Sequence, residues 1–188
     1  MTVGPVLAQL RIATGNLHQK LDESLDAINR LAAIDSRRDM ICGYLAFHTS
    51  ADAAIAPWLS DEPGLDYALR RRSPALRQAL AALEGSTEPT RRPVPMLASR
   101  AQAYGALYVV EGSTLGGRLI RKAIADRGCD MVGLDFLDPY GAATGERWRT
   151  FLALLEANAE NQAAEAARGA IAAFELAAAS LRLLEIAT

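Results

Sequence analysis

Histidine is scarce in this sequence, which contains only His18 and His48. A neutral imidazole binds metal ions, and it exchanges a proton near neutral pH. His48 lies in the apolar run 44–48, which is typical of a histidine in or beside a hydrophobic core. His18 is therefore the stronger candidate for a metal ligand.

Around His18 the spacing places complementary residues on one strip of a helix. At about 100° of rotation per residue, Arg11, Gly15 and Asp22 lie within about 60° of His18. The Asp22 carboxylate, one turn on, can hydrogen-bond the second nitrogen of a metal-bound imidazole. Arg11 lies about 10 Å along the helix axis, where it can meet an acidic group on a flat ligand centred at His18. A boundary histidine with an ordinary i,i+4 partner is the alternative.

A second cluster is the glycine-rich segment 108–118, with the sequence YVVEGSTLGGR. Glycine in a helix interior costs about 1 kcal/mol relative to alanine, so Gly112, Gly116 and Gly117 need a compensating reason. Gly112 and Gly116 share a helix face, where bare backbone lets a flat or bulky group approach closely and makes a kink easy. Close packing of two helices uses the same spacing and is the alternative.

The segment 138–151 combines a loop with the start of a further helix. Thr144 is a good N-cap residue, and Trp148 and Phe151 are spaced to face a core. Nothing in the composition of this segment is catalytic, and we interpret it as structural.

The elements that must hold these clusters are helical. Alanine, leucine, arginine, glutamate and glutamine favour helix, and no segment alternates β-branched and polar residues as a strand does. The expected helices span 6–25, 36–56, 66–83, 96–127, 146–156 and 161–185, with loops at 86–95 and 128–145. Ser36 is the expected N-cap of the second helix, which Pro57 ends. The first helix has a leucine face formed by Leu7, Leu10, Leu17 and Leu21.

Length and composition favour one soluble domain over 1–188. At 188 residues the chain suffices for one core, and 51% hydrophobic and 22% charged residues are ordinary for a globular protein. The net charge of −2 argues against nucleic acid or an acidic membrane surface as a partner. The sequence has only two cysteines and no secretory signal, which predicts a cytoplasmic protein. It has no apolar run of roughly 18 residues, so we expect no membrane span.

Together the three segments resemble bacterial haem oxygenases, and the likeness covers 7–185. The matching residues are Leu10-Arg11 through Leu17-His18, the run Gly112-Ser113-Thr114-Leu115-Gly116-Gly117, and Tyr140-Gly141, Thr144-Gly145, Trp148 and Phe151. Any one motif is weak, but the three together are fairly specific. The resemblance implies an all-α fold, a compact single-domain multi-helix bundle, with haem held between the first helix and a kinked glycine helix.

The resemblance also implies a role for each candidate on the proximal side of the haem. His18 matches the family's proximal iron ligand and is the one metal ligand expected. Asp22 matches a carboxylate position, usually glutamate, near that imidazole. Arg11 and Tyr108 match positions that contact the haem propionates in similar bacterial enzymes.

On the distal side, Gly112 and Gly116 match the glycines whose backbone lies over the oxygen site. Gly117 is expected beside the haem with them. Gly112, Ser113 and Gly116 are the expected catalytic positions. Ser113 occupies a position that is aspartate in the animal enzymes, so their distal water network does not carry over to this chain.

In enzymes of this family haem is both cofactor and substrate. With O2 and a reductant it is cleaved to biliverdin, iron and carbon monoxide. The resemblance implies an electron donor such as a ferredoxin or flavoprotein reductase, and a bilin acceptor such as a phytochrome is a further candidate partner. Arg118, Arg121 and Lys122 follow the glycines and could guide an acidic donor.

Other helical proteins remain alternatives. The first is a non-catalytic haem-binding or haem-transfer protein of the same fold. A di-iron carboxylate bundle needs repeated Glu-x-x-His pairs, which this sequence lacks. A thiaminase-like hydrolase needs a nucleophilic cysteine in an acidic pocket, and neither Cys42 nor Cys129 is well placed for that.

Overall fold

The computed structural model describes residues 4–85, 88 and 92–182, and within these ranges it contains helices and no strands. The all-α fold class expected from the sequence is confirmed. The α-helices are α1 Pro5–Leu25, α2 Ala27–Ala32, α3 Ile34–Leu59, α4 Ser73–Ala82, α5 Arg100–Asp126, α6 Thr144–Ala159 and α7 Ala163–Arg182. Short 3-10 helices span Tyr67–Arg70, Asp135–Leu137 and Gly141–Ala143.

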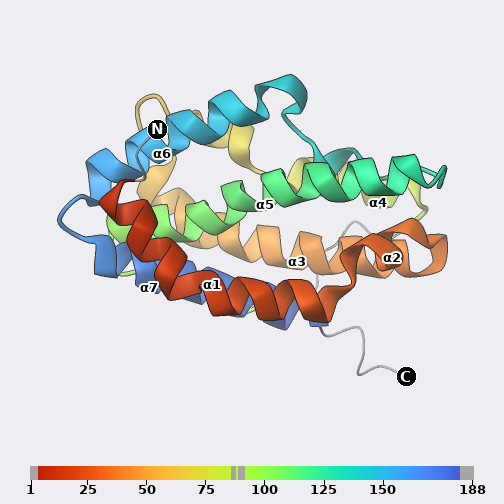
Figure 1. Ribbon diagram of the computed structural model, residues 1–188, viewed down its shortest axis with the longest axis horizontal. Helices are drawn as coiled ribbons and strands as arrows, with labels where there is room; N and C mark the ends of the chain where they lie inside the picture. The colour runs from red at the N-terminus through yellow and green to blue at the C-terminus, as the bar shows by residue number, and fades with distance from the viewer. Residues whose placement is uncertain (1–3, 86–87, 89–91, 183–188) are drawn as a thin grey trace.

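The helix α7 packs against α1, α3 and α5, as the lengthwise arrangement in Figure 1 shows. Small side chains make close packing possible along α7, where the buried residues include Ala166, Ala170, Ala173 and Ala177. The helix α6 packs on both α1 and α5. Both α1 and α5, which carry the candidate residues, therefore rest on the same two helices.

A close backbone contact joins α5 to α7 at two glycines. A Cβ atom on Gly105 would overlap the carbonyl group of Ala166, and one on Gly169 would overlap that of Gln102. Because any side chain would push the two backbones apart, glycine is required at both positions. These two glycines, which the sequence did not single out, serve helix packing.

The first three helices differ in detail from the sequence expectation. A short helix, α2, follows α1 because Asp26 adopts a left-handed backbone conformation with a φ of 42°. The next helix, α3, begins at Ile34 rather than Ser36. The Ser36 hydroxyl donates to the Arg30 carbonyl at 2.7 Å, so Ser36 closes the preceding turn instead of capping α3.

The prediction that Pro57 ends the second helix was wrong, because α3 continues through Pro57 to Leu59. Proline removes one helical hydrogen bond, that to the carbonyl of the residue four positions earlier. Pro57 and that residue, Ala53, are both exposed, so water can replace the missing donor.

Two later helices are shorter than expected. The expected helix 66–83 is divided into the 3-10 helix Tyr67–Arg70 and α4, which has a proline in its first turn. The helix α5 begins at Arg100, because the Ser99 hydroxyl accepts the Gln102 N–H at 3.2 Å and caps it.

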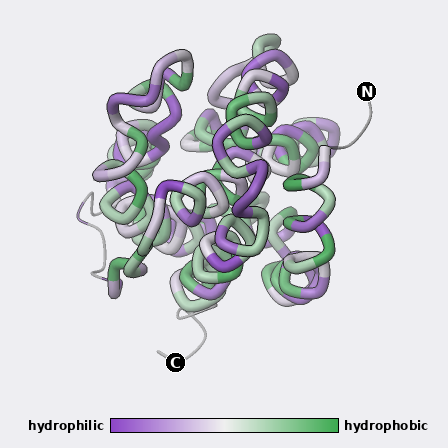
Figure 2. The backbone as a smooth tube through the Cα atoms, turned by 90° about the vertical axis from the view of Figure 1, so that its left-hand side faces the viewer, coloured by the Kyte–Doolittle hydropathy of each residue, from purple (hydrophilic) through white to green (hydrophobic). Residues whose placement is uncertain are grey.

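Hydrophobic and hydrophilic residues alternate along the helices (Figure 2). This pattern is expected for amphipathic helices that surround a core. Each of the α-helices α1 to α7 contributes buried hydrophobic side chains to that core. In the described ranges, no helix is long and apolar enough to cross a membrane.

Candidate functional site

His18 and Asp22 form the pair that their spacing predicted. The His18 Nδ1 lies 3.0 Å from the Asp22 Oδ2, and the side chains are 64% and 66% exposed. Phe174 of α7 contacts the imidazole in an edge-on arrangement, with ring centroids 5.7 Å apart. With Nδ1 engaged by a carboxylate, Nε2 is the ring nitrogen that can bind a metal.

Arg11 of α1 and Tyr108 of α5 are in contact, although their segments lie far apart in the sequence. Arg11 and Thr14 of α1 both interact with the Tyr108 phenol group. Burial raises the pKa of Tyr108, and the positive charge of Arg11 partly opposes that rise. The phenol is therefore neutral at physiological pH, and a cation and a hydroxyl group stand at one point between α1 and α5.

The three glycines of the 108–118 segment face two directions. Open space lies beside Gly116, and a Cβ atom on Gly112 would approach the Trp148 ring at 3.9 Å. A Cβ atom on Gly117 would instead lie 2.5 Å from the Leu137 carbonyl oxygen. Gly112 and Gly116 thus leave bare backbone on an open face, whereas Gly117 packs against the 3-10 helix Asp135–Leu137. The expected place of Gly117 beside the haem stays a prediction.

The open face of α5 is largely apolar. Leu115 is 39% exposed and Leu119 is 71% exposed, and by helix periodicity both share the face of Gly112 and Gly116. Ser113 is also exposed, and its hydroxyl donates to the Val110 carbonyl at 2.7 Å. Exposed apolar side chains clustered on one helix face are typical of a surface that binds a ligand or partner.

Trp148, whose spacing predicts a position facing the core, borders this face. The Trp148 ring of α6 lies 5.9 Å from Tyr108 and 5.6 Å from Phe151, measured between centroids. Phe151 is fully buried, as its spacing predicted, but Trp148 is half-buried and adjoins Gly112. Sequence periodicity could not separate the two residues, and it carried no signal for Phe174 beside His18.

The two candidate faces belong to helices that meet at one point and then separate. The contact between Arg11 and Tyr108 joins α1 to α5. Toward their C-terminal ends the two helices move apart (Figure 1). His18 and Gly116, which follow the contact on their respective helices, are both exposed. The arrangement offers an imidazole on one helix and bare backbone on the other.

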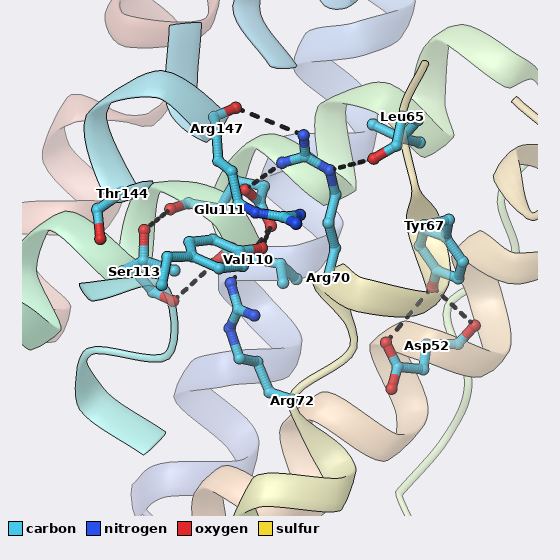
Figure 3. Close-up of polar contacts among 12 residues, drawn as sticks. Asp52, Leu65, Tyr67, Arg70, Arg72, Val110, Glu111, Ser113, Thr144 and Arg147 are labelled. Atoms are coloured by element: carbon cyan, nitrogen blue, oxygen red, sulfur yellow. Dashed lines mark hydrogen bonds and ion pairs between the residues drawn. The ribbon is translucent and has the colours of Figure 1, made fainter. Parts of the chain in front are cut away.

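A buried ion cluster holds α5 immediately before the open face. The Glu111 side chain is 1% exposed, and its Oε2 accepts a hydrogen bond from Arg70 Nη1 at 2.5 Å. Its Oε1 accepts hydrogen bonds from Arg72 Nη2 at 3.3 Å and from the Tyr140 hydroxyl at 2.8 Å. Figure 3 shows Arg70 and Arg72 converging on Glu111 from the segment that precedes α4. No pattern in the sequence indicates this cluster, because its members are scattered along the chain.

His48 is a core residue in this structure. It is 4% exposed, and burial together with the charge of Arg72 lowers its pKa to about 3. An imidazole that stays neutral at physiological pH and is enclosed by the core is unsuited to bind a ligand from solvent. This agrees with the interpretation of His48 as a core or boundary histidine.

The basic residues that follow the glycines are each close to a carboxylate. The pairs are Arg118–Asp138 at 3.9 Å, Arg121–Asp135 at 3.2 Å and Lys122–Asp126 at 2.6 Å. The charge of this group is therefore balanced locally. The geometry weakens the case for these residues as the guide for an acidic electron donor.

Comparison with solved structures defines the fold. The haem oxygenase from Neisseria meningitidis, solved in its NO- and CO-bound forms, is similar to this chain with a TM-score of 0.80. The match covers 97% of this chain and 92% of the Neisseria chain, at 24% sequence identity. The fold is that of haem oxygenases.

Comparison of sequences defines the family. A haem oxygenase from Xanthomonas campestris pv. campestris (strain 8004) is 38% identical over 116 residues, which are 60% of this chain and 67% of that protein. No family model matches the chain. The chain belongs to the haem oxygenase family, which is a family of oxidoreductases. The family resemblance and the enzyme class predicted from the sequence are confirmed.

Proposed function

We propose that this chain binds haem through His18 and, with O2 and a reductant, cleaves it to biliverdin, iron and carbon monoxide. The observation that carries the proposal is the interaction between Arg11 and Tyr108. Arg11 on α1 and Tyr108 on α5 are the two candidate contacts for the haem propionates. His18 follows on the first of these helices, and the open glycine face follows on the second. Membership of the haem oxygenase family supports the proposal independently.

The residues on α1 fit a haem rather than a metal ion held by side chains alone. In the described part of the chain, no three His, Cys, Asp or Glu side chains converge to hold a metal. A haem needs only an axial ligand from the protein, because the ring nitrogens supply the others. The Asp22 carboxylate holds His18 Nδ1, which orients the ring and makes Nε2 a better donor.

Arg11 and Tyr108 are suited to the acidic edge of such a ligand. Arg11 lies two helical turns before His18, about 10 Å along the axis at 1.5 Å per residue. That separation suits a ligand whose centre is at His18 and whose carboxylates are at its rim. A guanidinium and a phenol together donate strong hydrogen bonds to a carboxylate.

The glycine face is suited to the opposite side of the ring. Gly112 and Gly116 have no side chain to obstruct a small molecule bound there. Leu115, Leu119 and Trp148 would shed water when the ring covers them. Excluding bulk water protects reactive stages of oxidation from side reactions. When bound, haem supplies the redox centre and is itself the substrate.

The deciding experiment identifies the products. Purified protein with haemin is supplied with ferredoxin and its reductase in air, and catalase is present throughout. We expect carbon monoxide release and one dominant biliverdin isomer on chromatography. Stable haem binding without product would instead indicate a haem-binding or haem-transfer protein. Bleaching that catalase prevents would indicate unspecific peroxide damage, and either outcome would overturn the proposed reaction.

A further inference from the structure

The ion cluster around Glu111 directly precedes the open glycine face in the chain. Its carboxylate and the guanidiniums of Arg70 and Arg72 are all at least 96% buried. Burying charges costs several kcal/mol per ion, so a buried ion pair is seldom a better stabiliser than apolar side chains of the same volume. In some proteins buried polar and ionic groups serve to impose one specific arrangement.

Each partner of Glu111 is itself fixed. Arg70 Nε donates to the Leu65 carbonyl at 2.6 Å, and its Nη2 donates to the Arg147 carbonyl at 3.4 Å. Arg70 thus connects the 3-10 helix Tyr67–Arg70 to the start of α6 and to α5. A guanidinium with several oriented acceptors has little freedom to move, so the position of Glu111 is closely defined.

The position of the Tyr140 hydroxyl is fixed by contacts that the Tyr140 ring makes with two guanidiniums. The guanidinium of Arg72 lies 4.4 Å from the ring centroid, and that of Arg147 lies 4.8 Å from it. Both contacts are within the range of cation–π attraction. The loop that precedes α6 therefore presents a fixed donor to Glu111.

The same loop fixes the far end of the glycine segment. Leu137, three residues before Tyr140, places its carbonyl oxygen where only a glycine at position 117 can fit. The segment is held at Glu111 by ion pairs and at Gly117 by backbone packing. Between these points Gly112 and Gly116 have no side chains that could fix the backbone on the open side. Because glycine is also the most flexible residue, the backbone there depends on the two fixed ends for its position.

We propose that Glu111 is a positioning residue whose buried pairs with Arg70, Arg72 and Tyr140 set where the backbone of 112–116 lies. This inference rests on the proposed function in one respect. If that backbone covers the haem, its position decides which carbon of the ring is attacked, because small displacements of reacting groups change rates strongly.

The first test compares Glu111→Gln with the wild-type protein by hydrogen–deuterium exchange in the absence of haem. The glutamine side chain has the same shape as glutamate but, being neutral, cannot form ion pairs with two guanidiniums. We expect faster amide exchange confined to the peptide 108–118 and the loop before α6. Unchanged exchange in that peptide would overturn the positioning role, whatever the protein does with haem.

The second test uses the haem complex and a matched pair of arginine variants. Arg70→Lys removes the geometry that holds Glu111. Arg37→Lys makes the same change at another fully buried arginine, which contacts the Leu31 carbonyl and Asp130, beyond the C-terminal end of α5. Both variants should lose stability. We expect the ratio of biliverdin isomers to change by about tenfold, and the C–O stretching frequency of the ferrous carbonyl complex to shift, in Arg70→Lys only.

A milder variant covers the case in which Glu111→Gln does not fold. Tyr140→Phe removes one hydrogen bond to Glu111 and keeps the ring between its two guanidiniums. It should shift the same C–O frequency in the same direction as Arg70→Lys. Equal shifts in the Arg37 control, or none in the Tyr140 variant, would assign the cluster to stability alone. Failure of the wild-type protein to bind haem would count against the proposed function and leave the exchange test decisive.

Discussion

Arg11 on α1 interacts electrostatically with the phenol of Tyr108 on α5. The two residues come from the two helices that carry the proposed iron ligand and the proposed oxygen face. In a haem enzyme this contact would be shared with the carboxylates of the ligand. The structure therefore predicts that carboxylate recognition can be separated from iron ligation by mutation.

Arg11→Ala should weaken haem binding by about tenfold. A hydrogen bond to a charged group contributes about 1.5–3 kcal/mol, and the lower end of that range applies because Arg11 is exposed to solvent. Absorbance titration with haemin measures the change in Kd. The dimethyl ester of haem lacks the two negative charges, so wild-type protein and variant should bind it with similar affinity. A tenfold loss that persists with the ester would show that Arg11 does not recognise the carboxylates.

His18→Ala should abolish the normal ferric spectrum of the haem complex. Added imidazole should restore it, because a free ligand can enter the space that the side chain vacates. His48→Leu is the matched control, since it replaces the other histidine with a buried apolar residue of similar volume. The absorption spectra of both complexes check the assignment, which is wrong if the His48 variant loses the spectrum and the His18 variant keeps it.

His48 should make the stability of the protein depend on pH. Its pKa is about 3 in the folded state, against 6.5 for an unperturbed histidine. Between these values the unfolded chain binds the proton more readily, so the free energy of unfolding falls as pH falls below about 6.5. At pH 5 the loss from this one group is about 2 kcal/mol relative to pH 7.

The variant His48→Gln, whose side chain does not titrate, isolates this contribution. Urea denaturation at pH 7 and pH 5 should show a smaller loss of stability in His48→Gln than in the wild-type protein. An identical pH dependence in the two proteins would mean that His48 is accessible to protons in the folded state.

Gly116 and Gly117 should respond oppositely to a side chain. Gly116→Leu places a side chain in open space and replaces glycine with a better helix former, so the unfolding temperature should stay the same or rise while haem cleavage slows. Gly117→Ala forces a methyl group against the Leu137 carbonyl and should cost about 1–3 kcal/mol of stability. Calorimetry and single-turnover kinetics check the two effects. Normal turnover in a well-folded Gly116→Leu protein would remove Gly116 from the oxygen site.

Local patterns in the sequence were sufficient for the helical class and for the pairing of His18 with Asp22. Residues four apart on a helix are neighbours whatever the rest of the chain does, so that contact follows from spacing. The segment motifs were likewise sufficient to identify the family. Helix ends were less predictable. Whether a helix continues through Pro57 depends on whether water reaches the Ala53 carbonyl that the proline leaves unpaired.

The tertiary structure alone decided which residues meet across helices. Adjacent glycines look equivalent in sequence, yet Gly116 faces open space and Gly117 faces Leu137 because the 3-10 helix Asp135–Leu137 packs on one side of α5. Glu111 resembles an ordinary helical carboxylate until the fold buries it between two arginines from another segment. Such contacts depend on how helices cross and which loops cover them, and periodicity within one helix carries no information about either.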